Sequence, residues 1–190
     1  MKLYSYVVDH DTGRALNPYF GVCTLRGCKF RCSPGKPRNV EELARVGDWV
    51  IGTGGANLQK SAGHGKLIYA MRVDEKLTRE EYYADPRFAK KRLENSPQGN
   101  NKRPVNNFER YEQFALISRH FYYFGANAID IPEKFLKLGL EKKGPGFRCD
   151  FRDIGGFVKW IEAHKTGKHG EPRMKPMDKS KGSKGCKSSC

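Results

Sequence analysis

The chain has 190 residues and a formal net charge of +15, from 36 Lys and Arg against 21 Asp and Glu. This length suits one domain with a real core, and a content of 37% hydrophobic and 12% aromatic residues argues against a disordered chain. No stretch approaches the roughly 20 apolar residues of a membrane span, and the first ten residues lack the long apolar run and cleavage site of a signal peptide. The sequence therefore predicts a cytoplasmic protein with no membrane partner.

The first half of the chain predicts mainly strands joined by loops. Asn39 is expected to cap a helix that Gly47 ends, and Thr78 is expected to cap another through a capping box with Glu81. Residues 9–21 contain many Gly, Pro and Asp residues and predict a long loop. The expected strands are residues 3–8, 23–25, 48–55 and 66–74.

The second half predicts fewer regular elements. Residues 94–107 are polar and predict a surface loop, and residues 113–124 predict one or two β segments with a bend. Pro132 is expected to start a helix that Gly139 closes, and Asp153 or a neighbour to begin a final amphipathic helix.

Positive charge is spread over the whole chain. Residues 165–190 hold eight basic and two acidic residues, which leaves a net charge of +9 on residues 1–164. We therefore expect one domain over residues 1–164, followed by a basic, low-complexity, disordered tail over residues 165–190. A basic folded domain is typical of a polyanion binder and favours nucleic acid as the partner. A membrane surface, another acidic partner, or solubility charge with no such partner are the alternatives.

Strands and short helices mix without regular βαβ alternation, which predicts an α+β fold rather than a doubly wound sheet. Three segments resemble the PUA-like superfamily, which includes the EVE, ASCH and YTH domains: residues 46–54, 65–73 and 82–88. This resemblance implies a PUA-like mixed β-barrel flanked by short helices.

The N-terminal half is also similar to a smaller family, nucleotide modification associated domain 2. The similarity rests on the segments Tyr4-Ser5-Tyr6-Val7-Val8, Asp11-Thr12-Gly13, Ala15-Leu16-Asn17-Pro18, Cys23-Thr24-Leu25, Cys28-Lys29, Gly47-Asp48-Trp49 and Gly52-Thr53-Gly54. It implies a role in modifying DNA bases.

A barrel of this kind would hold one base in a cleft. A base in a duplex must first be unstacked, at a cost of a few kcal/mol, and stacking on aromatic side chains returns roughly 1–3 kcal/mol per base. The residues predicted to bind the base are Asn17, Tyr19, Phe20, Trp49 and Thr53, and those predicted to bind phosphate are Arg26, Lys29, Lys66 and Arg119. Tyr6 is a further aromatic residue near these segments. The alternatives are core packing for Trp49 and Tyr6, and plain solvation for the four cations.

The predicted catalytic residues are Cys23, Asp48 and His10. A thiolate at Cys23, activated by His10 or a carboxylate, can attack an electron-poor carbon such as a nitrile. The family resemblance suggests hydration of a 7-cyano-7-deazaguanine base to its amide as one such reaction. A buried structural role for Cys23 and a turn or cap role for Asp48 are the alternatives.

No cofactor and no metal are predicted. Cys23, Cys28 and Cys32 have the spacing C-x4-C-x3-C, which differs from the usual zinc knuckle and has no paired second half.

The sequence leaves three hypotheses open. The first is a DNA base-modifying enzyme of the hydratase or hydrolase type, the second a non-catalytic reader of a modified base in DNA or RNA, and the third a basic accessory subunit of a DNA-modification complex. Other DNA-modification proteins are then further partners. An enzyme should bring a thiol and an ionisable group together in its pocket, whereas a reader should show only aromatic and amide groups there.

Overall fold

The computed structural model describes residues 1–27, 30–31, 38–92 and 113–174. Most of its strands belong to one mixed sheet: β1 (Leu3–Val8), β6 (Trp49–Gly54), β7 (Lys66–Arg72), β10 (Phe121–Tyr123), β11 (Ile129–Asp130), β12 (Phe147–Arg148) and β13 (Gly167–Lys168). The order in this larger sheet is β12-β1-β6-β7-β10-β13, and β11 also pairs with β7. The strands β1 and β6 run parallel, so their C-terminal ends lie side by side at the same end of the sheet.

A smaller antiparallel sheet has the order β2-β3-β9-β8, formed by β2 (Leu16–Asn17), β3 (Cys23–Arg26), β9 (Phe114–Ser118) and β8 (Glu75–Thr78). The short strands β4 (Phe30–Arg31) and β5 (Arg38–Asn39) pair with each other.

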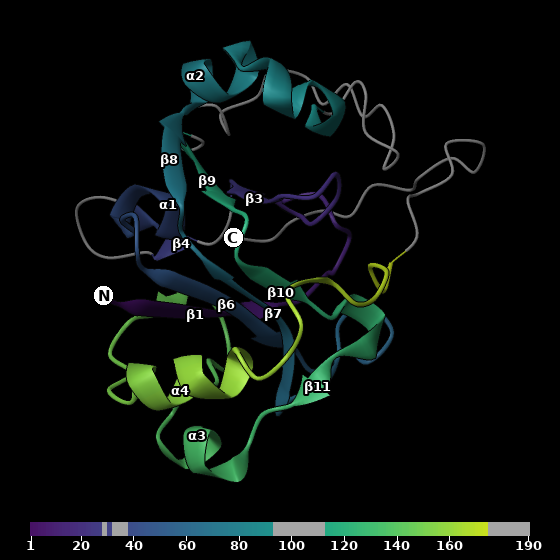
Figure 1. The fold of residues 1–190 in the computed structure, drawn as a ribbon. Coiled ribbons are helices and arrows are strands. Elements are labelled where there is room, and N and C mark those ends of the chain that lie inside the picture. The colour runs from purple at the N-terminus through teal and green to yellow at the C-terminus, as the bar shows by residue number, and fades with distance from the viewer. Residues whose placement is uncertain (28–29, 32–37, 93–112, 175–190) are drawn as a thin grey trace.

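The two main sheets are joined at a corner. There β7 continues into β8 and β9 continues into β10, and the Asp74 Oδ2 atom accepts hydrogen bonds from the backbone N–H groups of Arg119 (2.7 Å) and His120 (3.2 Å). Figure 1 shows the smaller sheet on one side of the larger one. This corner confirms the bend predicted within residues 113–124.

The helices are short: α1 (Val40–Leu43), α2 (Arg79–Ala84), α3 (Glu133–Lys137), α4 (Ile154–Ile161), and the 3-10 helices η1 (Pro86–Lys91) and η3 (Gly125–Asn127). The predicted caps are confirmed, because Asn39, Thr78 and Asp153 each accept a backbone hydrogen bond from the first turn of their helix. Figure 1 shows α3 and α4 on the face of the larger sheet opposite the smaller sheet, and α2 beyond the smaller sheet.

The core therefore has two main layers. The layer between the larger sheet and the helices contains Trp49, Tyr122 and Phe157. The layer between the two sheets contains Tyr6, Cys23, Tyr69 and Tyr123 among others.

The α+β class is confirmed, but the PUA-like barrel is not. In the part of the chain that the structure describes, the strands pair into separate open sheets and no closed barrel forms.

Two further expectations, on helix α1 and on the C-terminal tail, need correction. Helix α1 ends at Leu43, and Gly47 instead takes a positive φ of 89° in the turn where its N–H bonds to Val73 O. Residues 165–174, expected in the tail, contain β13, which pairs with β10.

Some expectations lie outside the described residues. These are the loop at residues 94–107, the side chains of Cys28, Lys29 and Cys32, and residues 175–190 of the expected tail. Over the described ranges, none of the helices has the length and apolar character needed to cross a membrane.

Candidate functional site

A small cleft opens where β1 ends and the chain turns towards β2. Its volume is about 170 Å³, which is below the roughly 300–1,000 Å³ of sites for drug-sized ligands and suits a small group. The lining residues are Tyr6, Val8, Asp9, His10, Asp11, Thr12, Gly13, Arg14, Ala15, Leu16 and Ile68. We call this the loop cleft.

A row of tyrosines runs across the larger sheet, beginning at Tyr6 on the lining of the loop cleft. Tyr6, Gly52, Tyr69 and Tyr123 are direct partners across β1, β6, β7 and β10, so they share one face of the sheet. A Cβ atom on Gly52 would lie 2.3 Å from the Tyr69 ring, and the glycine therefore leaves the space that this ring fills. The Tyr69 hydroxyl then donates a 2.6 Å hydrogen bond to the hydroxyl of Tyr6, which lines the cleft.

Asp11 ties the wall of the cleft to distant parts of the chain. Its side chain accepts hydrogen bonds from the Tyr123 hydroxyl at Oδ1 (2.6 Å) and from the Arg173 N–H at Oδ2 (3.2 Å). Its backbone N–H donates to Lys60 O, and its carbonyl accepts from the Met174 N–H. Asp11 is only 4% exposed, and this burial raises the pKa of its carboxyl above the ordinary value, while the hydrogen bonds from Tyr123 and Arg173 act in the opposite direction.

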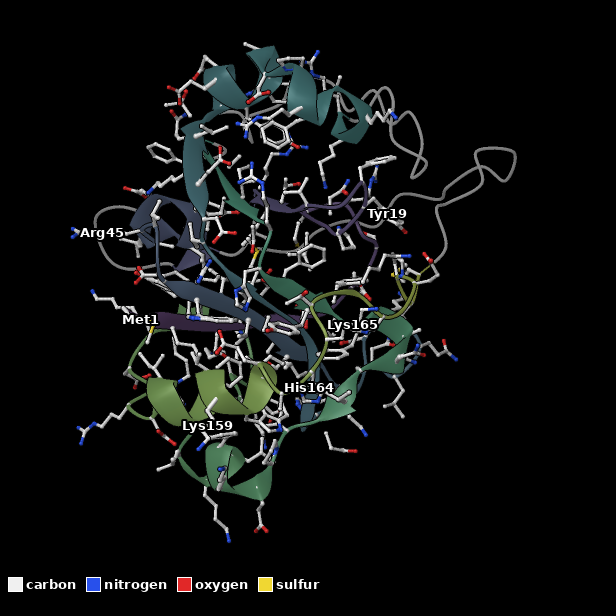
Figure 2. The ribbon with its side chains drawn as sticks, viewed as in Figure 1. Met1, Tyr19, Arg45, Lys159, His164 and Lys165 are labelled. Carbon is white, nitrogen blue, oxygen red and sulfur yellow. The ribbon has the colours of Figure 1, made fainter. Side chains whose placement is uncertain are left out.

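The segment that reaches Asp11 is residues 167–174, which we call the C-terminal strap. It is yellow in Figure 1 and runs beside β10. Glu171 of the strap accepts a 3.1 Å hydrogen bond from the Tyr19 hydroxyl and forms an ion pair with Lys168, whose ammonium lies 4.9 Å from the Tyr19 ring centroid. Figure 2 labels Tyr19 close to this segment. The strap is thus part of the folded domain, because it binds Asp11 and Tyr19, which lie towards the two ends of the segment between β1 and β3.

The loop cleft offers mixed polar chemistry. The residues on its lining include Asp9, His10, Asp11, Thr12 and Arg14, which carry carboxylate, imidazole, hydroxyl and guanidinium groups. These groups supply both hydrogen-bond donors and acceptors. A small, flat, polar molecule with donors and acceptors on its edges matches such a lining. The same groups can also transfer protons.

The three predicted catalytic residues do not meet in this cleft. Cys23 is fully buried in the layer between the sheets, and burial raises its pKa to about 12 against the opposing effect of the nearby Lys91 charge. A thiol with that pKa is almost entirely protonated at neutral pH, which does not fit a nucleophile.

Asp48 lies at the other end of β6. Its carboxylate accepts hydrogen bonds from the backbone N–H groups of Lys2 (2.7 Å) and Arg45 (3.0 Å), which is the turn role that the sequence left as an alternative. Of the predicted catalytic residues, His10 is the one that lines the loop cleft, and it is exposed.

The predicted base-binding residues are dispersed. The Trp49 ring is buried and stacks on Tyr122 with a centroid distance of 6.4 Å, and Thr53 Oγ1 donates to Tyr6 O within the sheet. Asn17 is also buried, and its Oδ1 accepts hydrogen bonds from the Tyr19 N–H and from Lys91 Nζ. Tyr19 and Phe20 alone of the five reach the surface, on the hairpin that follows the cleft.

The predicted phosphate-binding cations all have partners within the chain where the structure describes them. Arg26 lies over the rings of Tyr82 and Tyr83 and donates to the Tyr83 hydroxyl. Lys66 pairs with Asp130 and Arg119 with Glu75, at 2.7 and 2.8 Å. Their role towards phosphate stays a prediction.

The described residues contain no group of three or more His, Cys, Asp or Glu side chains placed to hold a metal ion. Cys28 and Cys32, which share a segment with Cys23, lie outside those residues.

The tyrosine row and the central position of Asp11 were not predicted from the sequence. Asp11 was visible in the segment Asp11-Thr12-Gly13, but its partners Tyr123 and Arg173 are 112 and 162 residues away. The tyrosines were visible only as strand residues, because their alignment depends on the register of four strands.

Comparison with known protein families complements this geometry. The model of the family described as nucleotide modification associated domain 2 matches residues 1–107 and 93–180. The chain belongs to this family. Membership in nucleotide modification associated domain 2 links the chain to the modification of nucleic acid bases, and both the loop cleft and the C-terminal strap lie within the matched residues. No curated protein and no solved structure shows a significant match to the chain.

Proposed function

We propose that this nucleotide modification associated domain 2 protein binds one nucleobase, extruded from DNA, in the loop cleft. The observation that carries the proposal is the lining of the cleft, where Asp9, His10, Thr12 and Arg14 lie around a small volume that Tyr6 also lines. Such groups can satisfy the donors and acceptors on the edge of a base once it has left the helix.

The charge of the chain supports DNA as the partner. A net charge of +15 attracts the phosphate backbone, and this attraction is independent of sequence. The cleft then supplies the contacts that depend on the base. Binding to phosphate positions the protein, and binding in the cleft selects the position where it acts.

For a modification reaction, the groups in the cleft favour acid–base chemistry over thiol chemistry. Asp9 and His10 line the cleft, whereas the Cys23 thiol lies in the core with a raised pKa. Hydration of a 7-cyano-7-deazaguanine base to its amide would therefore use a carboxylate or imidazole to activate water, with no covalent thiol intermediate.

A non-catalytic reader of a modified base is the second candidate. One observation favours it: both oxygens of Asp11 are occupied, by the Tyr123 hydroxyl and the Arg173 N–H, so this carboxylate organises the cleft rather than offering a base for catalysis.

Filling the cleft tests the proposal. Ala15 lines the cleft and is exposed, so Ala15→Trp should block it without disturbing the core. We expect single-stranded oligonucleotides to bind the wild type about tenfold more tightly than matched oligonucleotides with one central abasic position, because a base in a site contributes roughly 1–3 kcal/mol. Ala15→Trp should remove that difference, as measured by fluorescence anisotropy.

The matched control is Ala163→Trp, which adds the same ring at an exposed position just after α4. It should behave as the wild type. Equal binding of base-containing and abasic oligonucleotides by the wild type, across all four bases and 7-cyano-7-deazaguanine, would refute the proposed base site.

A further inference from the structure

The hairpin that joins β2 to β3 carries an exposed aromatic ring in a strained backbone conformation. Phe20 is 49% exposed and has a φ of 61°, and it is the one non-glycine residue with a positive φ in the part of the chain that the structure describes. Gly21 follows with a φ of 76°. The left-handed region is unfavourable for a bulky side chain, and turns with two such residues normally contain Asn, Asp or Gly.

The hairpin around Phe20 is firmly anchored. The buried Lys91 ammonium donates hydrogen bonds to Asn17 O (2.8 Å), to Asn17 Oδ1 (3.0 Å) and to Val22 O (2.6 Å), so one cation ties together the two sides of the turn. The Tyr19 hydroxyl is bound to Glu171 of the C-terminal strap. The surrounding structure thus holds Phe20 in its strained conformation and keeps its ring at the surface.

The hairpin is continuous with the loop cleft. Leu16 both lines the cleft and begins β2, and the same strap that binds Tyr19 through Glu171 binds Asp11 through Arg173. Phe20 itself is not part of the cleft lining. Its ring therefore lies outside the proposed base site, on the hairpin that continues from the lining residue Leu16.

We infer that Phe20 is a wedge that enters the DNA duplex at the step from which the base moves into the loop cleft. This inference rests on the proposed function. Phe is among the apolar side chains that proteins insert between base steps, where the ring replaces part of the stacking that the duplex loses. Strained and exposed residues of this kind also concentrate at functional sites, because a strained conformation persists only where the surrounding structure enforces it.

A wedge is needed for a duplex but not for a single strand, and this difference provides the test. In Phe20→Asn the backbone conformation suits the new residue, so the fold should be kept. The probes are a duplex with 2-aminopurine at one central position and the corresponding single strand. We expect wild-type protein to increase the 2-aminopurine fluorescence of the duplex, and Phe20→Asn to lose this increase and to bind the duplex about tenfold more weakly. Both proteins should bind the single strand equally, within about twofold.

Val46→Asn is the matched control, since Val46 is 64% exposed and follows Arg45, which Figure 2 shows on the opposite side of the molecule from Tyr19. It should match the wild type on both probes. Equal loss of duplex and single-strand binding in Phe20→Asn would mean that Phe20 stacks on the bound base, and no loss on either would mean that the ring has no role in binding. Each result overturns the wedge. A wild type that does not distinguish base-containing from abasic single strands would instead refute the base site itself.

Discussion

Trp49→Ala is expected to lower the free energy of unfolding by about 3–5 kcal/mol, the usual cost of removing a large aromatic side chain from a core. The Trp49 ring is 1% exposed, stacks on Tyr122, and meets Phe157 edge to face at 6.1 Å. Its loss would leave a cavity between the larger sheet and α4. Chemical denaturation followed by circular dichroism measures this change.

The same experiment separates two interpretations of Trp49 that the sequence left open. If Trp49 is a core residue, its truncation should destabilise the fold. If it is a stacking platform for a base, its truncation should leave the fold intact and weaken base binding. Trp160→Ala is the comparison, because Trp160 packs at the edge of the same layer and is only partly buried. A Trp49→Ala variant as stable as wild type would contradict the position of this ring in the structure.

Asp11→Ala is expected to lower the free energy of unfolding by about 3–5 kcal/mol. It leaves the buried Tyr123 hydroxyl and the Arg173 N–H without their acceptor, and an unsatisfied buried polar group costs about 1–3 kcal/mol, more where a charged partner is lost. Tyr123→Phe removes one of these bonds and should cost less. A double-mutant cycle of the two changes should show strong coupling, and additive effects would contradict the hydrogen bond.

The pH dependence of Asp11→Ala has an unusual sign. Burial raises the pKa of Asp11, so the folded state binds the proton more tightly than the unfolded state does. The contribution of this group to stability therefore grows as the pH falls from neutral towards about 4, the ordinary value for an aspartate. We expect the stability difference between wild type and Asp11→Ala to widen over this range. A difference that narrows would contradict the raised pKa.

Local sequence signals predicted the elements that local interactions determine. The strand at residues 66–74 and the capping box of Thr78 and Glu81 require only alternation, propensity and neighbouring side chains, and both are present. Helix α1 is shorter than expected because of a long-range contact: Gly47 resembles a helix terminator, but its N–H donates to the carbonyl of Val73, which follows β7.

The candidate site could not be predicted in this way, because it depends on long-range contacts. The tyrosine row exists only once Tyr6, Tyr69 and Tyr123 are brought into register. The C-terminal strap has a tail-like composition of Lys, Gly and His, and it is ordered because Asp11 and Tyr19 supply its partners. Cys23 had the sequence context of an exposed strand end, and it is the pairing of β3 with β9 that places it in the core.

The most direct test of a base site in the loop cleft is to map where a base contacts the protein. Oligonucleotides carrying 5-iodouracil, 5-iodocytosine or 6-thioguanine at one position can be photocrosslinked, digested with trypsin and analysed by mass spectrometry. Residues 3–14, between Lys2 and Arg14, form one tryptic peptide that contains Tyr6, Asp9 and His10. We expect crosslinks to this peptide in the wild type and their loss in Ala15→Trp. Crosslinks confined to peptides from other parts of the chain would contradict a base site in the loop cleft.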